Sequence, residues 1–327
     1  MNPVIAGYVL PGLPQTLLTP NANPGYAKLR AAFDKVRDEV ENSGADVLMI
    51  YSTMWPSVIG HQVQAMPEPE WVHVDEEFHD LGSIPYKFKI DAKFAEGYVK
   101  NAKLRGLQAR TVAYKGFPID TGSVVAMKLI NPKNKIPAIM ISSNIYADRA
   151  ETVVLGKAAL DALREQNKKA VAVVISTLSN RLHQKFIDPK DDAIHSLKDQ
   201  EWNQKILEFF SEGRLEDVAQ LSRQIHKEAR VKKVSSFKPF WWLSSVMGAH
   251  NRYKGEVFEY QTLYGTGSAV IGLKPTAHAA RDLEFDEESP EQYAGDRNVL
   301  QAAPEAMADM SSQSTNPGRD AEEDESL

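Results

Sequence analysis

The first 52 residues alternate between apolar runs and one amphipathic segment. Residues 4–10 form an apolar run that ends at a loop containing Pro11, Gly12 and Pro14, which predicts a buried strand. Asn23 and Pro24 form a helix start signal, and apolar residues then recur at helical spacing until residues 43–44. Residues 46–52 predict a second buried strand. This order of strand, helix and strand predicts a parallel βαβ unit.

The same alternation continues through the middle of the chain. Helices are expected near residues 92–105, 121–130 and 148–166, and strands near 109–113, 136–142 and 169–176. The chain then becomes helical from about residue 199 to residue 247, and two strands at 256–263 and 268–273 follow. We expect an α/β fold in which helices flank a central, largely parallel or mixed sheet.

Charge divides the chain into two parts near residue 280. The 327 residues carry 38 basic and 44 acidic side chains, and residues 281–327 alone contain 3 basic and 14 acidic ones. The first 280 residues therefore carry 35 basic and 30 acidic side chains. We predict one α/β domain over residues 1–280 and a disordered acidic tail over 281–327.

Composition excludes several classes of protein and partner. The sequence has no cysteine, so disulfides, thiolate metal sites and cysteine nucleophiles are excluded. No apolar run is long enough to span a membrane, and no basic segment precedes the first apolar run, so we expect a cytoplasmic protein without a signal peptide. Short basic pairs such as Lys168-Lys169 and Lys232-Lys233 have no interleaved aromatic residues, and nucleic-acid binding is not expected.

Common catalytic motifs are absent, and the remaining candidates have structural alternatives. None of the eight histidines lies two to four residues from another, so no local metal-binding pair exists; His61, just after a predicted strand, is the best single candidate. Asp120 either caps the helix that follows it or lines a pocket. Glu256 is either a rim residue or part of a site. The glycines at 265 and 267 favour a tight hairpin over a phosphate-binding loop.

Six segments together resemble the class III extradiol ring-cleavage dioxygenases: residues 6–14, 46–55, 116–122, 176–179, 199–216 and 260–270. The resemblance covers about residues 3–274. Catalytic members of this family hold Fe(II) with two histidines and one glutamate. The resemblance places the histidine positions at Gly12 and Met54 and the glutamate at Glu256. The general acid/base histidine of the family falls at Asn180.

These replacements indicate a chain without catalytic iron. Glycine has no side-chain ligand, the Met54 thioether is a poor ligand for Fe(II), and asparagine does not transfer protons near neutral pH. The resemblance is strongest to the alpha subunits of two-subunit members that open aminophenol rings. It implies a non-catalytic subunit that pairs with a paralogous catalytic beta-like chain carrying Fe(II), as an α2β2 heterotetramer.

Two alternatives remain open from the sequence. One is an Fe(II)-dependent dioxygenase with a relocated site that uses Glu256, His61 and His183. The other is a module that binds an aromatic molecule without chemistry in the former active-site pocket. The candidate residues of this pocket are Trp55, His61, Asp120 and His183, together with Gly12, Met54, Asn180 and Glu256.

Overall fold

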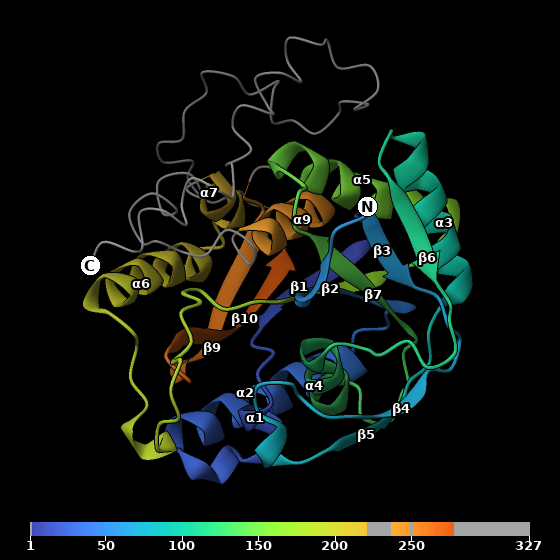
Figure 1. Cartoon of the computed structure of the whole chain (residues 1–327). Helices are drawn as coiled ribbons and strands as arrows, with labels where there is room; N and C mark the ends of the chain where they lie inside the picture. The colour runs from blue at the N-terminus through green and yellow to red at the C-terminus, as the bar shows by residue number, and fades with distance from the viewer. Residues whose placement is uncertain (1, 221–236, 249–250, 278–327) are drawn as a thin grey trace.

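Eight strands form the central sheet of the computed structural model, which describes residues 2–220, 237–248 and 251–277 (Figure 1). Their order across the sheet is β6-β3-β7-β2-β8-β1-β10-β9. Their bounds are β1 Val4–Leu10, β2 Val47–Ser57, β3 His61–Gln64, β6 Ala109–Val112, β7 Ala138–Asn144, β8 Ala170–Ile175, β9 Tyr253–Leu263 and β10 Thr266–Pro275. β1, β8, β2 and β7 are mutually parallel, as are β3 and β6, whereas β3–β7, β1–β10 and β10–β9 are antiparallel pairs. The predicted α/β fold class is confirmed.

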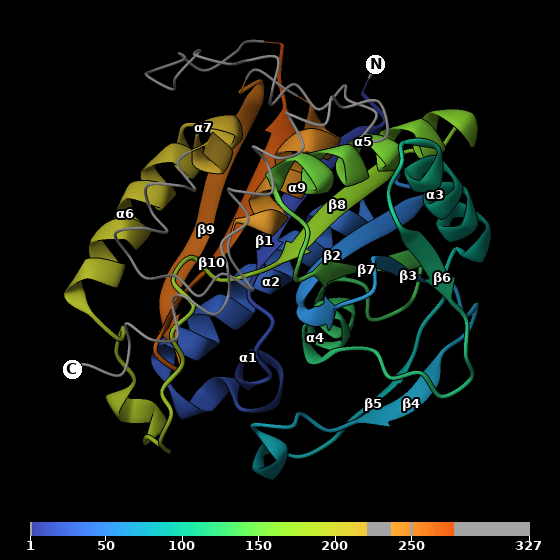
Figure 2. The ribbon, with the colours of Figure 1, turned by 45° about the horizontal axis from the view of Figure 1, so that its top comes forward.

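Helices cover both faces of this sheet because its strands are apolar on both sides (Figure 2). Along β1, Val9 belongs to one buried cluster, and its neighbours Tyr8 and Leu10 belong to the other. The first cluster includes side chains of α3 (Ala92–Leu104), α5 (Arg149–Glu165), α6 (Leu197–Ser211), α7 (Leu215–Gln220) and α9 (Lys238–Met247). The second includes side chains of α2 (Pro24–Glu41) and α4 (Thr121–Ile130).

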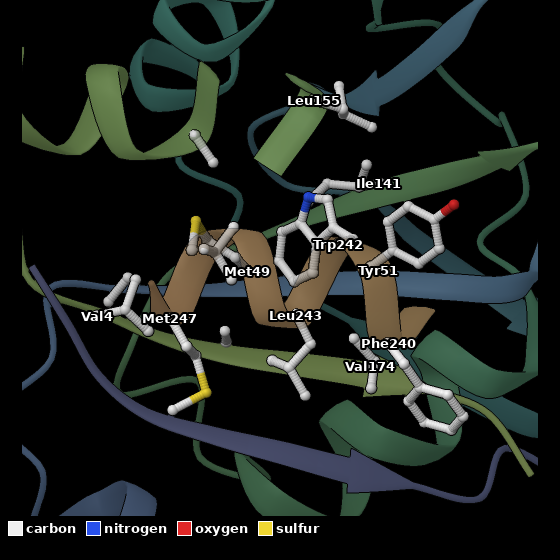
Figure 3. Close-up of a cluster of buried hydrophobic side chains, with 14 of the residues drawn as sticks. Val4, Met49, Tyr51, Ile141, Leu155, Val174, Phe240, Trp242, Leu243 and Met247 are labelled. Carbon is white, nitrogen blue, oxygen red and sulfur yellow. The ribbon is translucent and has the colours of Figure 1, made fainter. Parts of the chain in front are cut away.

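Trp242 lies at the centre of the first cluster (Figure 3). Its ring stacks on Tyr51 with centroids 5.5 Å apart, and its Nε1 donates a hydrogen bond to Tyr98 Oη at 3.0 Å. Leu243 and Met247 on the same helix contact the sheet beside it. The buried indole therefore has its polar atom satisfied, and the Trp241-Trp242 segment belongs to the core rather than to a ring-stacking site.

Side-chain caps begin five of the described helices, and two of these caps, Asn23 and Asp120, carry a signal in the sequence. The Asn23 side chain accepts a hydrogen bond from Gly25 N before α2, and Pro24 occupies its first turn. Asp91, Asp120, Asp148 and Ser196 act in the same way before α3, α4, α5 and α6. Short helices complete the set: α1 Gln15–Leu18 and the three 3₁₀ turns Pro20–Ala22, His79–Leu81 and Pro189–Asp191.

The β9–β10 hairpin confirms the predicted tight turn. Leu263 pairs with Thr266 across it, and the two turn residues, Tyr264 and Gly265, have φ angles of 50° and 86°. Two successive positive φ angles are typical of the hairpin turns that match the twist of antiparallel strands. Gly265 therefore shapes the turn, whereas Gly267 lies within β10, where it pairs with Thr262.

The structure differs from the sequence prediction mainly between residues 53 and 91. The sequence predicts no strand in this stretch, but it contains β3 and a separate two-stranded sheet of β4 (Glu70–His73) and β5 (Ile84–Lys87). β2 also continues to Ser57, with a register shift between Ser52 and Pro56. β4 and β5 have only four residues each and are partly exposed, so their alternation of apolar and polar residues is too short to recognise in the sequence.

Several predictions fall on residues that the structure does not describe. The acidic tail at 281–327, the Lys232-Lys233 pair and His226 and His250 all lie outside the described residues. The domain boundary at residue 280 therefore stays a prediction. None of the described helices is both long enough and apolar enough to cross a membrane.

Candidate functional site

Gly12 and Met54 meet at the carboxyl ends of β1 and β2, where ligands bind in open α/β sheets. A Cβ atom added to Gly12 would lie 2.6 Å from Met54 Sδ and 2.5 Å from Ile175 Cγ2. It would also lie 2.9 Å from Gly122 Cα, which is backbone and cannot move aside. The space that a side chain at position 12 would need is therefore filled by the thioether and its neighbours.

The residues at this point do not fit Fe(II). Position 12 supplies no donor atom, and Met54 supplies a soft thioether where Fe(II) prefers imidazole and carboxylate. Within the described residues, no group of three or more His, Asp or Glu side chains is arranged to hold a metal ion. Met54 and Ile175 thus close the space beside Gly12 by apolar packing.

Glu256 lies apart from these two residues. It is exposed on the edge strand β9, where it pairs with Gly272, which in turn pairs with Tyr8 in the middle of β1. Gly12 lies two residues beyond the carboxyl end of β1. The structure thus places Glu256 on a different strand and level of the sheet, away from the contact between Gly12 and Met54.

Asp120 is the N-cap of α4 and also holds the end of β2. Its Oδ1 accepts hydrogen bonds from Ser123 N at 3.0 Å and from Ser52 Oγ at 2.6 Å. Ser52 Oγ in turn accepts a hydrogen bond from Met54 N at 3.2 Å. The capping role predicted for Asp120 is confirmed, and through Ser52 the same carboxylate fixes the backbone that places Met54.

A second polar cluster beside this cap was not predicted from the sequence. Thr121 Oγ1 donates to Asp75 Oδ2 at 2.5 Å and lies 2.6 Å from His73 Nε2. Burial lowers the pKa of His73, although nearby carboxylates, Asp75 first, act in the opposite direction. These bonds tie the β4 segment to the start of α4. The only sequence signal was the polar turn at Asp75, whose Oδ1 accepts from Glu77 N and Phe78 N.

His61 is buried within the sheet. It begins β3, is 2% exposed, and donates from its backbone N to Gln108 O at 2.8 Å. Burial, followed by the charge of Lys238, lowers its pKa to about 4. β3 and β9 stand six strands apart in the sheet order, which is about 29 Å at the usual strand spacing. His61 and Glu256 therefore do not meet, and a relocated site built on both has no geometric support.

Asn180 and His183 lie in the loop after β8 and line a cavity of about 900 Å³. His183 Nε2 lies 3.1 Å from the carbonyl O of Ala193 and 3.6 Å from Asp192 Oδ1. Trp55 lies elsewhere, half-buried against Phe117 with ring centroids 5.8 Å apart. The candidate pocket residues are thus separated: His183 lines this cavity, Trp55 and Asp120 lie near α4, and His61 is buried within the sheet.

Comparison with known protein families identifies the class of protein. A family model described as the catalytic LigB subunit of aromatic ring-opening dioxygenase matches residues 6–272, and the chain belongs to this family. The predicted resemblance is confirmed.

The chain is also similar to individual proteins of known sequence or structure. The chain is 29% identical over 270 residues to the 2-aminophenol 1,6-dioxygenase alpha subunit of Pseudomonas sp., covering 82% of this chain and 98% of that one. It is 28% identical over 286 residues to the beta subunit of the same enzyme, covering 82% and 93%. An uncharacterized protein of Escherichia coli K12 has a similar fold, with a TM-score of 0.54 and 14% identity over 83% of this chain and 99% of that one.

Proposed function

We propose that this chain is a non-catalytic, alpha-like subunit of a dioxygenase complex that opens aminophenol or catechol-type rings with O2. The observation that carries the proposal is the filled space at Gly12, where Met54 Sδ and Ile175 Cγ2 occupy the position of a ligand side chain. Asn180 replaces the general acid/base histidine that the family resemblance implies, so proton transfer at that position is also lost.

The relatives support the rest of the proposal. Both an alpha and a beta subunit of one 2-aminophenol 1,6-dioxygenase match the chain over 82% of its length. The partner is a paralogous beta-like chain that carries Fe(II) and the reaction, and 2-aminophenol is the first substrate to test. An α2β2 stoichiometry and a cytoplasmic location are part of the same proposal.

Exposed apolar side chains favour a protein partner. Near α4, Trp71 and Val72 of β4 are 57% and 53% exposed, and Tyr114 is 73% exposed. Trp71 also lies beside Gly116, two residues along the chain from Tyr114. Large apolar groups gathered at a surface are typical of protein interfaces. This surface, formed by Trp71, Val72 and Tyr114, is our candidate contact with the beta-like chain.

The test is co-expression of the chain with a beta-like paralogue and measurement of the mass of the assembly by light scattering. We expect a hetero-oligomer, and we expect Trp71→Ser combined with Tyr114→Ser to weaken it at least tenfold. The matched control is Leu104→Ser, which removes a side chain that is 64% exposed on α3 and should leave assembly unchanged. A chain that remains a homogeneous assembly of its own copies, and never binds the paralogue, would contradict the proposal.

A further inference from the structure

The β4–β5 hairpin forms a two-stranded sheet of its own at the edge of the molecule, beside α4 (Figure 1, Figure 2). Phe88 N donates a hydrogen bond to Pro69 O, and three steps along the same register Val72 pairs with Pro85. Hydrogen-bonded and non-bonded pairs alternate along an antiparallel ladder, so Glu70 and Val72 belong to the non-bonded pairs. The backbone N–H and C=O groups of Glu70 and Val72 therefore point away from β5.

The two outer edges of this hairpin differ. On the β5 side, Pro85 has no N–H, and Lys87 O accepts a hydrogen bond from Asn134 Nδ2 at 2.7 Å. On the β4 side, no described residue outside the hairpin hydrogen-bonds to the backbone of Glu70 or Val72. An open strand edge of this kind is a template for pairing with a strand of another chain.

Both faces of β4 are apolar and exposed. Successive side chains of a strand point to opposite faces, and the neighbours Trp71 and Val72 are 57% and 53% exposed. Val74, just beyond the strand, is 47% exposed, and Pro85 opposite Val72 is exposed as well. A strand added at this edge would cover these apolar side chains and would also pair the free backbone groups.

The charge around this edge indicates which strand fits it. Residues 68–80 contain six acidic side chains and no lysine or arginine, and all of the acidic ones except Asp75 are exposed. Lys87 of β5 offsets one of them, because its Nζ lies 3.0 Å from Glu70 Oε2. Pairing with β4 of a second copy would bring two acidic segments together, and like charges at close range repel. The edge therefore favours a strand that is flanked by lysine or arginine.

We propose that β4 receives an extended segment of the beta-like chain, which adds a third strand to the β4–β5 sheet. This inference rests on the proposed function, because it gives the mode of contact at the surface formed by Trp71, Val72 and Tyr114. The added segment has alternating apolar residues and lysine or arginine at its ends. Its backbone hydrogen-bonds to the outward groups of Glu70 and Val72, and its apolar side chains cover the faces of β4.

The first test compares two substitutions at one residue, in assembly of the full chain with the beta-like paralogue. Val72→Pro removes the outward N–H and places a ring at the pairing edge, so the Kd should rise roughly tenfold or more. Val72→Ser keeps the N–H, so the Kd should rise by about threefold at most. Thermal unfolding of Val72→Pro should match the wild type, because Val72 forms no backbone hydrogen bond with β5 and Pro85 already occupies the opposite position.

Hydrogen exchange at residue resolution gives a second measurement that needs no variant. The amides of Glu70 and Val72 should exchange rapidly in the free chain and become protected in the complex. The Lys87 amide faces the opposite edge of the hairpin and should keep its rate in both states, so it is the matched control. Raising NaCl from about 0.05 M to about 0.5 M should also weaken assembly, because salt screens the flanking charges.

Three results would overturn this inference. They are equal assembly of Val72→Pro and Val72→Ser, equally fast exchange of the Glu70 and Val72 amides in the complex and in the free chain, and assembly that salt does not weaken. If the wild type still assembles in these cases, the proposed subunit role holds and only the mode of contact is wrong. A wild-type chain that never binds the paralogue would contradict the proposed role itself.

Discussion

Met54 Sδ and the missing side chain at Gly12 occupy one space, so the two residues are energetically coupled. We predict that Gly12→Ala destabilises the fold by about 1–3 kcal/mol, because the new methyl group meets Met54, Ile175 and backbone at Gly122. Adding Met54→Ala should recover part of this loss, since it removes one of the three contacts. The measurement is thermal unfolding of the wild type, both single variants and the double variant.

A strictly additive double variant would contradict this coupling, because independent sites add and residues in contact do not. Gly12→Ala with wild-type stability would show that the space is open. Either result would also remove the observation on which the non-catalytic role depends.

The buried imidazole of His61 links stability to pH. Its pKa in the folded protein is about 4 against an ordinary value of 6.5, so the folded state excludes a proton that the unfolded state binds. Its contribution is therefore complete above pH 6.5 and is lost as the pH falls towards 4. The shift corresponds to about 3 kcal/mol. Glu151 acts in the opposite direction over part of this range, because burial raises its pKa to about 7.

The comparison that isolates His61 is between the wild type and His61→Gln. We predict that the difference in free energy of unfolding between them changes by about 3 kcal/mol from pH 7 to pH 4, measured by urea denaturation. If His61→Gln follows the wild type in parallel, His61 is not buried as described.

Among the elements, α4 and the end of β2 depend on one carboxylate. Asp120→Ala removes the cap of α4 and the acceptor of the Ser52 hydroxyl, so we predict a loss of about 2 kcal/mol. Asp120→Asn keeps an oxygen at the same position and should lose less than half as much. Chemical denaturation of the two variants measures this. Equal losses would show that the charge of Asp120, rather than its hydrogen bonds, stabilises α4.

Elements with a strong local signal were predictable, and elements without one were not. The cap at Asn23, the following Pro24 and the apolar period fixed α2 to within two residues of its observed end. β4 could not be predicted because its four residues, including Trp71 and Val72, are mostly exposed and show no alternation of buried and exposed positions. β3 contributes only four residues, and its place between β6 and β7 depends on contacts far along the chain.

At the scale of the whole molecule, part of the candidate site could also be predicted from the sequence and part could not. The loss of iron ligands could be predicted from the sequence, because the family resemblance marks positions 12 and 54 and these positions hold glycine and methionine. The contact that closes this space depends on Ile175 and Gly122, which approach only in the folded chain. The cavity lined by Asn180 also brings together Phe78, His183 and Tyr264 from three distant segments, and no spacing in the sequence connects them.

The whole chain has the fold of its family but differs from it at the iron-ligand positions that the resemblance implies. Residues 6–272 match a family described by its catalytic subunit, yet the ligand positions that the resemblance implies hold Gly12, Met54 and an exposed Glu256. A fold alone does not determine an activity, because activity depends on the residues of the site. The chain keeps the family architecture, and the role proposed for it is assembly with a catalytic paralogue.

The most direct test is to load the purified chain anaerobically with Fe(II), measure bound iron, and follow oxygen uptake with 2-aminophenol on the same sample. The beta-like paralogue, treated in the same way, is the positive control. We predict no stoichiometric iron and no oxygen uptake for this chain alone. One bound iron per chain together with oxygen uptake and ring opening would contradict the account, and would mean that the chain holds a catalytic metal site of its own.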